Sequence, residues 1–208
     1  MSADRLSQIR SVMHTAAPQR PGLACELIAL ARAADERWVR LARTPSADQQ
    51  VGAGRHVDHT NGAALARRIA DYGWPDVPLV GEGGARAAWK IALRADTLPD
   101  FQRLASRLMH GAVERGTAPV SQWAHLYDRC LLNSRRAQCY GTQYRLGPGG
   151  PERLAVHEPD GLDARRASVG LPPAGLALQR LRERLAAEPS LDAEEYGGAP
   201  AVVLADAA

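Results

Sequence analysis

The sequence predicts a mainly α-helical protein, a single-domain helical bundle with one short β-hairpin near residues 139–158. Two patterns lead to this prediction. Apolar residues recur every three to four positions in several separate segments, which is the spacing of an amphipathic helix. The later stretch Y-G-T-Q-Y-R-L, G-P-G-G-P, E-R-L-A-V-H-E-P instead has two extended segments around a turn-rich loop. A length of 208 residues, with 45% hydrophobic and 24% charged residues, suits one domain with its own core.

Five helices are expected before the hairpin because each segment has an apolar face at helical spacing. The first carries Leu27 and Ala31 on that face, and the second carries Leu65 and Ile69. Glycine and proline residues separate the segments and favour breaks between the helices. The five segments are residues 23–43, residues 61–72, and the stretches that begin near Ala85, after Pro99 and after Pro119.

The third and fifth segments carry further features besides their apolar faces. In the third, Arg86, Lys90 and Arg94 form a basic stripe at positions i, i+4 and i+8. In the fifth, Trp123 and Tyr127 share the apolar face, and Pro119 suits the first turn of a helix. The third segment therefore carries a basic stripe in addition to its apolar face, and the apolar face of the fifth segment includes aromatic side chains.

The chain after the hairpin is expected to be helical again. A short helical turn should end at Gly170, and a last helix should cover residues 173–187. Residues 1–20 are weakly patterned and are expected to be weakly structured. The helical domain is then residues 21–187, and residues 188–208 are expected to form a frayed tail.

Composition argues against several classes of partner. No apolar run approaches the roughly 20 residues that span a membrane, and the N-terminus lacks an apolar signal core, so a cytoplasmic protein is expected. The three cysteines form no C-x-x-C pair, which favours reduced thiols and gives no zinc pattern. The net charge is only +3 and the arginines are scattered among acids, so no nucleic-acid partner is expected. The oligomeric state is left open.

Two carboxylates interrupt apolar helix faces, and such exceptions mark candidate functional residues. Asp35 lies near the middle of the face of the first helix, and Asp128 lies at the border of the face of the fifth. A buried carboxylate needs a partner, or its pKa rises. Each could be an ion-pair anchor or an acid/base group. Asp128 and Arg129 point in different directions on a helix, so each needs its own partner.

The stretch H-V-D-H-T-N at residues 56–61 allows two interpretations. Asp58 or Thr60 could cap the start of the second helix. Alternatively, His56, Asp58 and His59 could contribute to a metal site, although the pair of histidines lacks the i, i+4 spacing of a helical metal site. No metal site is therefore assigned. Asn61 shares the stripe of the second helix and is expected to point inward.

The sequence also resembles a known family. The segments D-E-R, V-D-H-T-N, Y-G-W-P, L-Y-D-R-C, Q-C-Y-G-T-Q and D-A-R-R-A-S-V-G-L look like a widespread bacterial family of uncharacterised proteins, a domain of unknown function. The resemblance runs from about residue 35 to residue 171. It implies a functional constellation at the matching positions, without naming a reaction. These positions are Asp35, Asp58, Asn61, Trp74, Asp128, Arg129, Gln138, Tyr140, Gly141, Thr142, Gln143 and Arg166.

One position departs from the family pattern, which usually has a Gln-His pair where this chain has Leu93 and Arg94. A histidine acid/base group is then lost, or a fixed cation is gained. Arg94 could bind an anionic substrate group through its planar guanidinium. It could equally complete a solvated basic stripe with Arg86 and Lys90.

These residues predict a small cofactor-independent enzyme that acts by acid/base chemistry on a polar or anionic small-molecule metabolite. The reaction would be a hydrolysis, elimination, isomerisation or cyclisation, with natural-product biosynthesis as the expected context. Dinucleotide, Walker and serine-hydrolase motifs are missing from the sequence, which argues against those chemistries. The alternative is a non-catalytic peptide- or protein-binding module whose polar cluster is structural. The expected catalytic groups are Asp35, Asp58 and Asp128, and the expected substrate-binding groups are Asn61, Trp74, Arg94, Arg129, Gln138, Tyr140, Thr142, Gln143 and Arg166.

Residues 138–143 are expected to form a strand that begins soon after the fifth helix. Strand alternation would send Gln138, Tyr140 and Thr142 to one face and Gln143 to the other. A bulge or twist at Gly141 would then be needed for the whole segment to line one site. Outside this segment, His110 and His125 are expected at the surface and Cys130 in the core.

Overall fold

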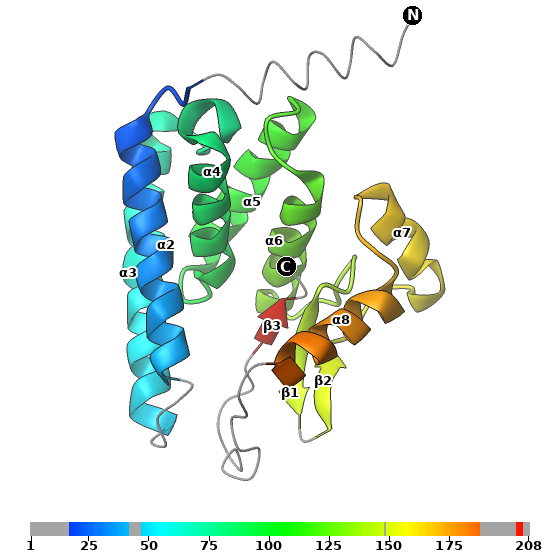
Figure 1. Cartoon of the computed structure of the whole chain (residues 1–208). Helices are drawn as coiled ribbons and strands as arrows, with labels where there is room; N and C mark the ends of the chain where they lie inside the picture. The colour runs from blue at the N-terminus through cyan, green and yellow to red at the C-terminus, as the bar shows by residue number, and fades with distance from the viewer. Residues whose placement is uncertain (1–16, 42–46, 148, 188–202, 206–208) are drawn as a thin grey trace, which may run out of the picture.

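The computed structural model describes residues 17–41, 47–147, 149–187 and 203–205, and helices dominate it as predicted (Figure 1). Most of the predicted N-terminal segment, residues 1–20, and of the predicted tail, residues 188–208, lies outside the described residues. The elements are α2 (Pro21–Leu41), α3 (Ala47–Tyr72), α4 (Val77–Arg94), α5 (Pro99–Glu114), α6 (Val120–Asn133), β1 (Gln143–Gly147), β2 (Gly150–Arg153), η1 (Pro159–Gly161), α7 (Leu162–Ser168), α8 (Ala174–Ala187) and β3 (Val203–Ala205).

The helices α2 to α6 pack into one bundle, with α2 against α3 and α4, and α5 against α6. Their apolar faces meet in a core that includes the fully buried Leu27, Leu65, Ala88 and Leu126. Full burial of one leucine side chain contributes about 1.5–3 kcal/mol, so this face-to-face packing supplies much of the stability. Within the described ranges, no helix combines the length and apolar character needed to cross a membrane.

Helix α3 is longer than predicted, because it begins at Ala47 and not near residue 61. The segment T-P-S-A-D-Q-Q-V-G-A-G-R was expected to be a loop, yet the helix runs through both Gly52 and Gly54. Glycine costs only about 1 kcal/mol relative to alanine inside a helix, and tertiary packing overrides that preference. Asp58 and Thr60 therefore lie inside α3, and their predicted role as a helix cap is wrong.

Helix α4 also begins earlier than predicted, at Val77. Asp76 caps it by accepting from the backbone N–H of Leu79 at 3.3 Å, and it accepts from the hydroxyl of Thr117 at 2.8 Å. Gly81 has a φ of 71° and kinks the helix, which is the break that the glycine-rich sequence suggested. The cap thus fixes the start of α4 against the loop that follows α5.

The C-terminal part of the domain is a small sheet with α8 packed against β2, and α7 packs against α8 (Figure 1). Strands β1 and β2 form the predicted hairpin, with Tyr144 opposite Arg153. A third strand, β3, pairs antiparallel with β1 and gives the order β2-β1-β3. The sequence did not predict β3. Helix α6 contacts β1 directly, which joins the sheet to the helical bundle.

Candidate functional site

Asp128 organises the turn that connects the bundle to the sheet. Its fully buried carboxylate accepts hydrogen bonds from the backbone N–H groups of Cys139, Tyr140 and Thr142 at 2.8, 3.0 and 3.0 Å. The hydroxyl of Thr142 donates to the same carboxylate at 2.9 Å. Gly141, with a φ of 60°, gives the chain the left-handed conformation that this wrapping requires. Gln138 forms an isolated β-bridge with Val156, but the predicted strand is wrong over residues 139–142, because these residues curl around a carboxylate.

The environment of Asp128 suits a structural anchor. Burial raises the pKa of its carboxyl group, and the hydrogen bonds from Tyr140, Thr142 and Cys139 oppose that shift without cancelling it. Its carboxylate is surrounded by donors from its own chain and has no contact with solvent. Direct contact between Asp128 and a substrate would require this turn to open.

Gln138 and Arg166 hold the same turn from two further sides. The amide of Gln138 accepts from the backbone N–H of Gln143 at 2.7 Å and donates to the carbonyl of Leu154 at 3.1 Å. The guanidinium of Arg166, which is fully buried, donates to the carbonyl of Tyr140 at 2.8 Å and to that of Pro172 at 2.6 Å. Both side chains thus bind backbone groups as substitutes for regular strand pairing.

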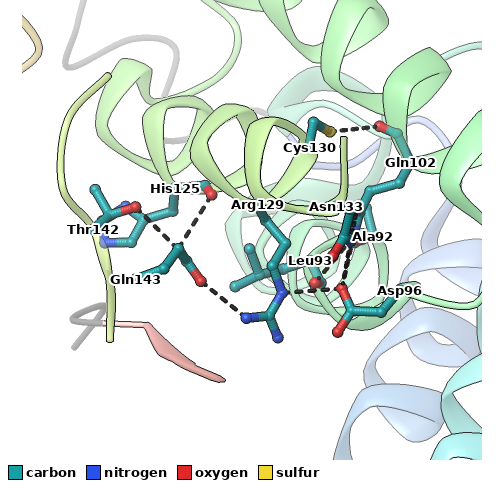
Figure 2. Close-up of polar contacts among 10 residues, drawn as sticks. All are labelled: Ala92, Leu93, Asp96, Gln102, His125, Arg129, Cys130, Asn133, Thr142 and Gln143. Atoms are coloured by element: carbon teal, nitrogen blue, oxygen red, sulfur yellow. Dashed lines mark hydrogen bonds and ion pairs between the residues drawn. The ribbon is translucent and has the colours of Figure 1, made fainter. Parts of the chain in front are cut away.

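Arg129 extends this network toward the end of α4 (Figure 2). Its guanidinium donates to Asp96 at 2.9 Å and to the amide oxygen of Gln143 at 3.2 Å. Gln143 in turn donates to the hydroxyl of Thr142 at 2.9 Å. Asp128 and Arg129 therefore have separate partners, as the sequence predicted. One chain of hydrogen bonds runs from Asp96, whose side chain is 44% exposed, to the buried Asp128.

Gln102 and Asn133 complete the network at the C-terminus of α4 (Figure 2). The amide of Gln102 donates to the carbonyls of Ala92 and Leu93 at 3.1 and 3.2 Å. Asn133 donates to the oxygen of Gln102 at 2.8 Å. Because the last carbonyls of a helix lack partners within it, this side-chain cap stabilises the end of α4.

A second group, here called the ionic cluster, consists of Asp35 on α2 and Lys90 and Arg94 on α4. Asp35 accepts from Lys90 at 2.9 Å and from Arg94 at 2.7 Å. The three side chains are 36%, 34% and 31% exposed, so the cluster is open to solvent. Asp58 and Asn61 from α3 are buried beside it and line, together with Lys90 and Arg94, a crevice too narrow to hold a water molecule.

The charges of the ionic cluster determine the ionisation of Asp35. Burial raises its pKa, but hydrogen bonds and charge attraction from Lys90 and Arg94 outweigh burial and lower it below its ordinary value. Asp35 is therefore ionised at neutral pH. Arg94 is not merely part of a solvated stripe, because its guanidinium binds this carboxylate.

The lowered pKa of Asp35 predicts a pH dependence of stability. Because the folded protein binds this proton less readily than the unfolded chain, the ion pairs stabilise the fold above the ordinary pKa, and this contribution is lost as the pH falls through the lowered pKa. The difference in unfolding free energy between wild type and Asp35→Asn, measured in urea, should therefore be largest at neutral pH and shrink as the pH falls below the ordinary pKa of an aspartate. A constant difference across this range would contradict the assignment.

The remaining predicted residues lie apart from both groups. Trp74 is buried in the core of the bundle. His56 and His59 are exposed on α3, and the ring of His59 lies 3.0 Å from the hydroxyl of Thr97. Among the described residues, no group of three histidine, cysteine or acidic side chains is placed to bind a metal ion. His125 is buried against Trp89, so its predicted surface position is wrong, whereas Cys130 is buried as predicted.

Comparison with known protein families gives a match over most of the chain. A model for a family of unknown function (DUF6624) matches residues 21–186, the span that contains both polar groups. The chain belongs to this family. No curated protein and no solved structure matches it. The family match therefore confirms the resemblance to an uncharacterised domain family. The description of the family names no reaction, so any chemistry of the DUF6624 domain must follow from its side chains.

The DUF6624 domain also has a cleft between α5 and α6 that the sequence did not predict. The spacing of the residues that line this cleft was visible in the sequence. Arg103, Arg107 and His110 recur at i, i+4 and i+7, and Trp123 and Tyr127 recur at i, i+4. Such spacing places each group on one helix face, but only the packing of α5 on α6 shows that the two faces meet.

Proposed function

We propose that this DUF6624 domain is a small cofactor-independent enzyme that performs acid/base chemistry on a polar, anionic metabolite at the ionic cluster. The observation that supports this most is an ionised carboxylate, Asp35, held between two cations and open to solvent. Asp35 interrupts an otherwise apolar helix face. Such a departure from the helical pattern, with a perturbed pKa, is a feature of functional sites.

The arrangement suits proton abstraction. An ionised Asp35 can accept a proton, while Lys90 and Arg94 can stabilise the negative charge that develops on the substrate. The lowered pKa makes Asp35 a weak base. The proton it removes must therefore be acidified by its surroundings, as it is beside the carbonyl group of a carboxylate or keto acid. This favours elimination, isomerisation or cyclisation among the reactions that the sequence suggested.

The wider context forms part of the same proposal. We assign the enzyme to the bacterial cytoplasm and to a biosynthetic role. All three cysteines are unpaired, which suits a reducing compartment. In this proposal Asp128 is removed from the catalytic groups and contributes to folding, because its carboxylate already binds Cys139, Tyr140 and Thr142. Asp35 then carries the acid/base role, and Arg94 replaces the histidine of the family pattern.

Solvent deuterium incorporation tests this proposal, because abstraction of a carbon-bound proton leaves a label even when no product accumulates. Wild-type protein is incubated in D2O with a panel of keto acids, hydroxy acids and amino acids, and exchange is followed by NMR. Asp35→Asn is expected to slow exchange by about 100-fold or more, which is the usual contribution of a general base.

Glu36→Gln provides a matched control, since Glu36 is the next residue on α2 and forms an exposed ion pair with Arg32 at 2.9 Å. It should leave the exchange rate unchanged. Equal exchange in wild type and Asp35→Asn, or no exchange of any panel member, would overturn the assignment of Asp35 as a base.

A non-catalytic binding module is the second candidate function. It is favoured by the network around Asp128, Gln138 and Arg166, which binds its own backbone and thereby accounts for much of the family motif through folding. In that case Lys90 and Arg94 would hold an anionic group of a peptide or protein. A bound partner recovered without chemical change and without deuterium would support this alternative.

A further inference from the structure

The cleft between α5 and α6 has the size of a small-molecule site. Its volume is about 390 Å³, within the range of about 300–1,000 Å³ that is typical of ligand pockets. Four of its residues come from α5, and four from α6, with Ser134 and Arg136 from the turn that follows. It shares no lining residue with the ionic cluster, so it is a separate site.

The cleft carries a concentrated positive charge. Arg103, Arg107 and Arg136 line it, and none of its lining residues is acidic. Arg103 is paired with Asp100 outside the cleft. For Arg107 and Arg136, no hydrogen bond or ion pair of the side chain is found within the described part of the chain. Two guanidinium groups that have no partner among the described residues favour an external anion, which they can bind through paired N–H donors.

An aromatic wall stands beside these arginines. Trp123 and Tyr127 stack with ring centroids 5.1 Å apart and an interplanar angle of 23°. The ring of His110 lies 4.6 Å from that of Trp123, and Tyr140 meets Trp123 edge-on at 6.0 Å. Rings held by such contacts present a fixed, flat surface. Because these side chains are already ordered, stacking of a planar ligand on them costs the protein little conformational entropy.

The thiol of Cys130 limits what the cleft can do chemically. Cys130 is buried in the wall, where burial raises its pKa to about 11. It donates a hydrogen bond to the carbonyl of Gln102 at 3.5 Å. A neutral thiol is a poor nucleophile, so it contributes apolar surface and does not favour a covalent intermediate. The cleft is thus suited to reversible binding.

We propose that this cleft binds a planar organic anion, with its aromatic ring against Trp123 and its phosphate or carboxylate group on Arg107 and Arg136. Neither feature alone selects this ligand class. The arginines would attract any anion, and the rings would accept any flat apolar molecule. A ligand that carries both an aromatic ring and an anionic group makes both contacts at once. A simple anion or an uncharged aromatic molecule makes only one of them and should bind more weakly.

Calorimetric titration with phenyl phosphate, benzoate, inorganic phosphate and benzyl alcohol tests the proposal. One of the two aromatic anions should bind at least about tenfold more tightly than inorganic phosphate and than benzyl alcohol, a difference of about 1.4 kcal/mol. Comparison of phenyl phosphate with benzoate identifies the preferred anionic group. Arg107→Gln and Arg136→Gln should each weaken the aromatic anion about tenfold. Trp123→Leu should weaken the aromatic anions and leave inorganic phosphate unchanged.

Two control variants test whether binding is confined to the cleft. Arg180→Gln changes an exposed arginine on α8 outside the cleft and should not alter binding. Arg94→Gln in the ionic cluster should also leave it unchanged, so this test is independent of the proposed enzyme activity. Circular dichroism confirms that each variant is folded. Absence of saturable binding by both aromatic anions, or equal loss of binding in the control and cleft variants, would overturn the proposal.

Discussion

Replacement of Asp128 by alanine is expected to lower the free energy of unfolding by about 4–5 kcal/mol, a large part of the 5–15 kcal/mol typical of a domain. Alanine removes the acceptor for three backbone N–H groups, the buried one of Thr142 and the part-buried ones of Cys139 and Tyr140. Each buried donor left without a partner costs about 1–3 kcal/mol. The turn has no regular strand pairing that could replace this acceptor.

Asparagine at position 128 should have an intermediate effect, a loss of about 2 kcal/mol. The amide avoids the cost of burying a charge, which is the same effect that raises the pKa of Asp128. It also retains one oxygen for the N–H groups of Cys139 and Tyr140. Its NH2 group, however, faces the backbone N–H of Thr142, so two donors meet. The effect of the amide therefore depends on how far the turn can relax.

Chemical denaturation of wild type, Asp128→Asn and Asp128→Ala measures this series, with Asp160→Asn as the control because Asp160 is exposed. The order wild type, asparagine, alanine is expected for stability, with the control equal to wild type. If Asp128→Ala kept wild-type stability but lost deuterium exchange, the anchor interpretation would be wrong and a direct role in catalysis would be favoured.

The sequence predicted the bundle because apolar periodicity reports which side of a helix is buried. The face that carries Leu27 and Ala31 and the helix that follows Pro99 are both present. The early start of α3 was not predictable, because Gly52 and Gly54 locally disfavour a helix. Such helix propensities are weak, and tertiary packing can override them. Strand β3 pairs with β1 across a long sequence separation, which periodicity does not report.

The candidate site was only partly predictable for a related reason. Polar residues at apolar positions correctly marked Asp35 and Asp128 as residues with strong partners. The sequence did not reveal the partners of Asp35 and Asp128, because a sequence motif does not report how far apart its residues lie in the fold. Asp35 instead meets Lys90 and Arg94 from α4, while Asp128 meets its own turn. The single predicted constellation therefore separates into an open ionic cluster and a buried network.

Arg166→Met is the second change with a large expected effect, a loss of about 3–5 kcal/mol in the free energy of unfolding. The fully buried guanidinium holds the carbonyls of Tyr140 and Pro172, at 2.8 and 2.6 Å. Methionine fills much of the volume but offers no donor, so these part-buried carbonyls lose a charged partner. The cost is then electrostatic and not a matter of packing.

Arg166→Lys separates the charge from the geometry. Lysine keeps the positive charge, but its single ammonium cannot match a planar guanidinium that donates from Nε to Pro172 and from Nη1 to Tyr140. It should therefore recover less than half of the stability lost in Arg166→Met. Thermal and urea unfolding measure the series, with Arg180→Met as an exposed arginine control. If lysine restored full stability, charge alone would account for Arg166. If methionine were neutral, Arg166 would be dispensable for folding and available for a ligand.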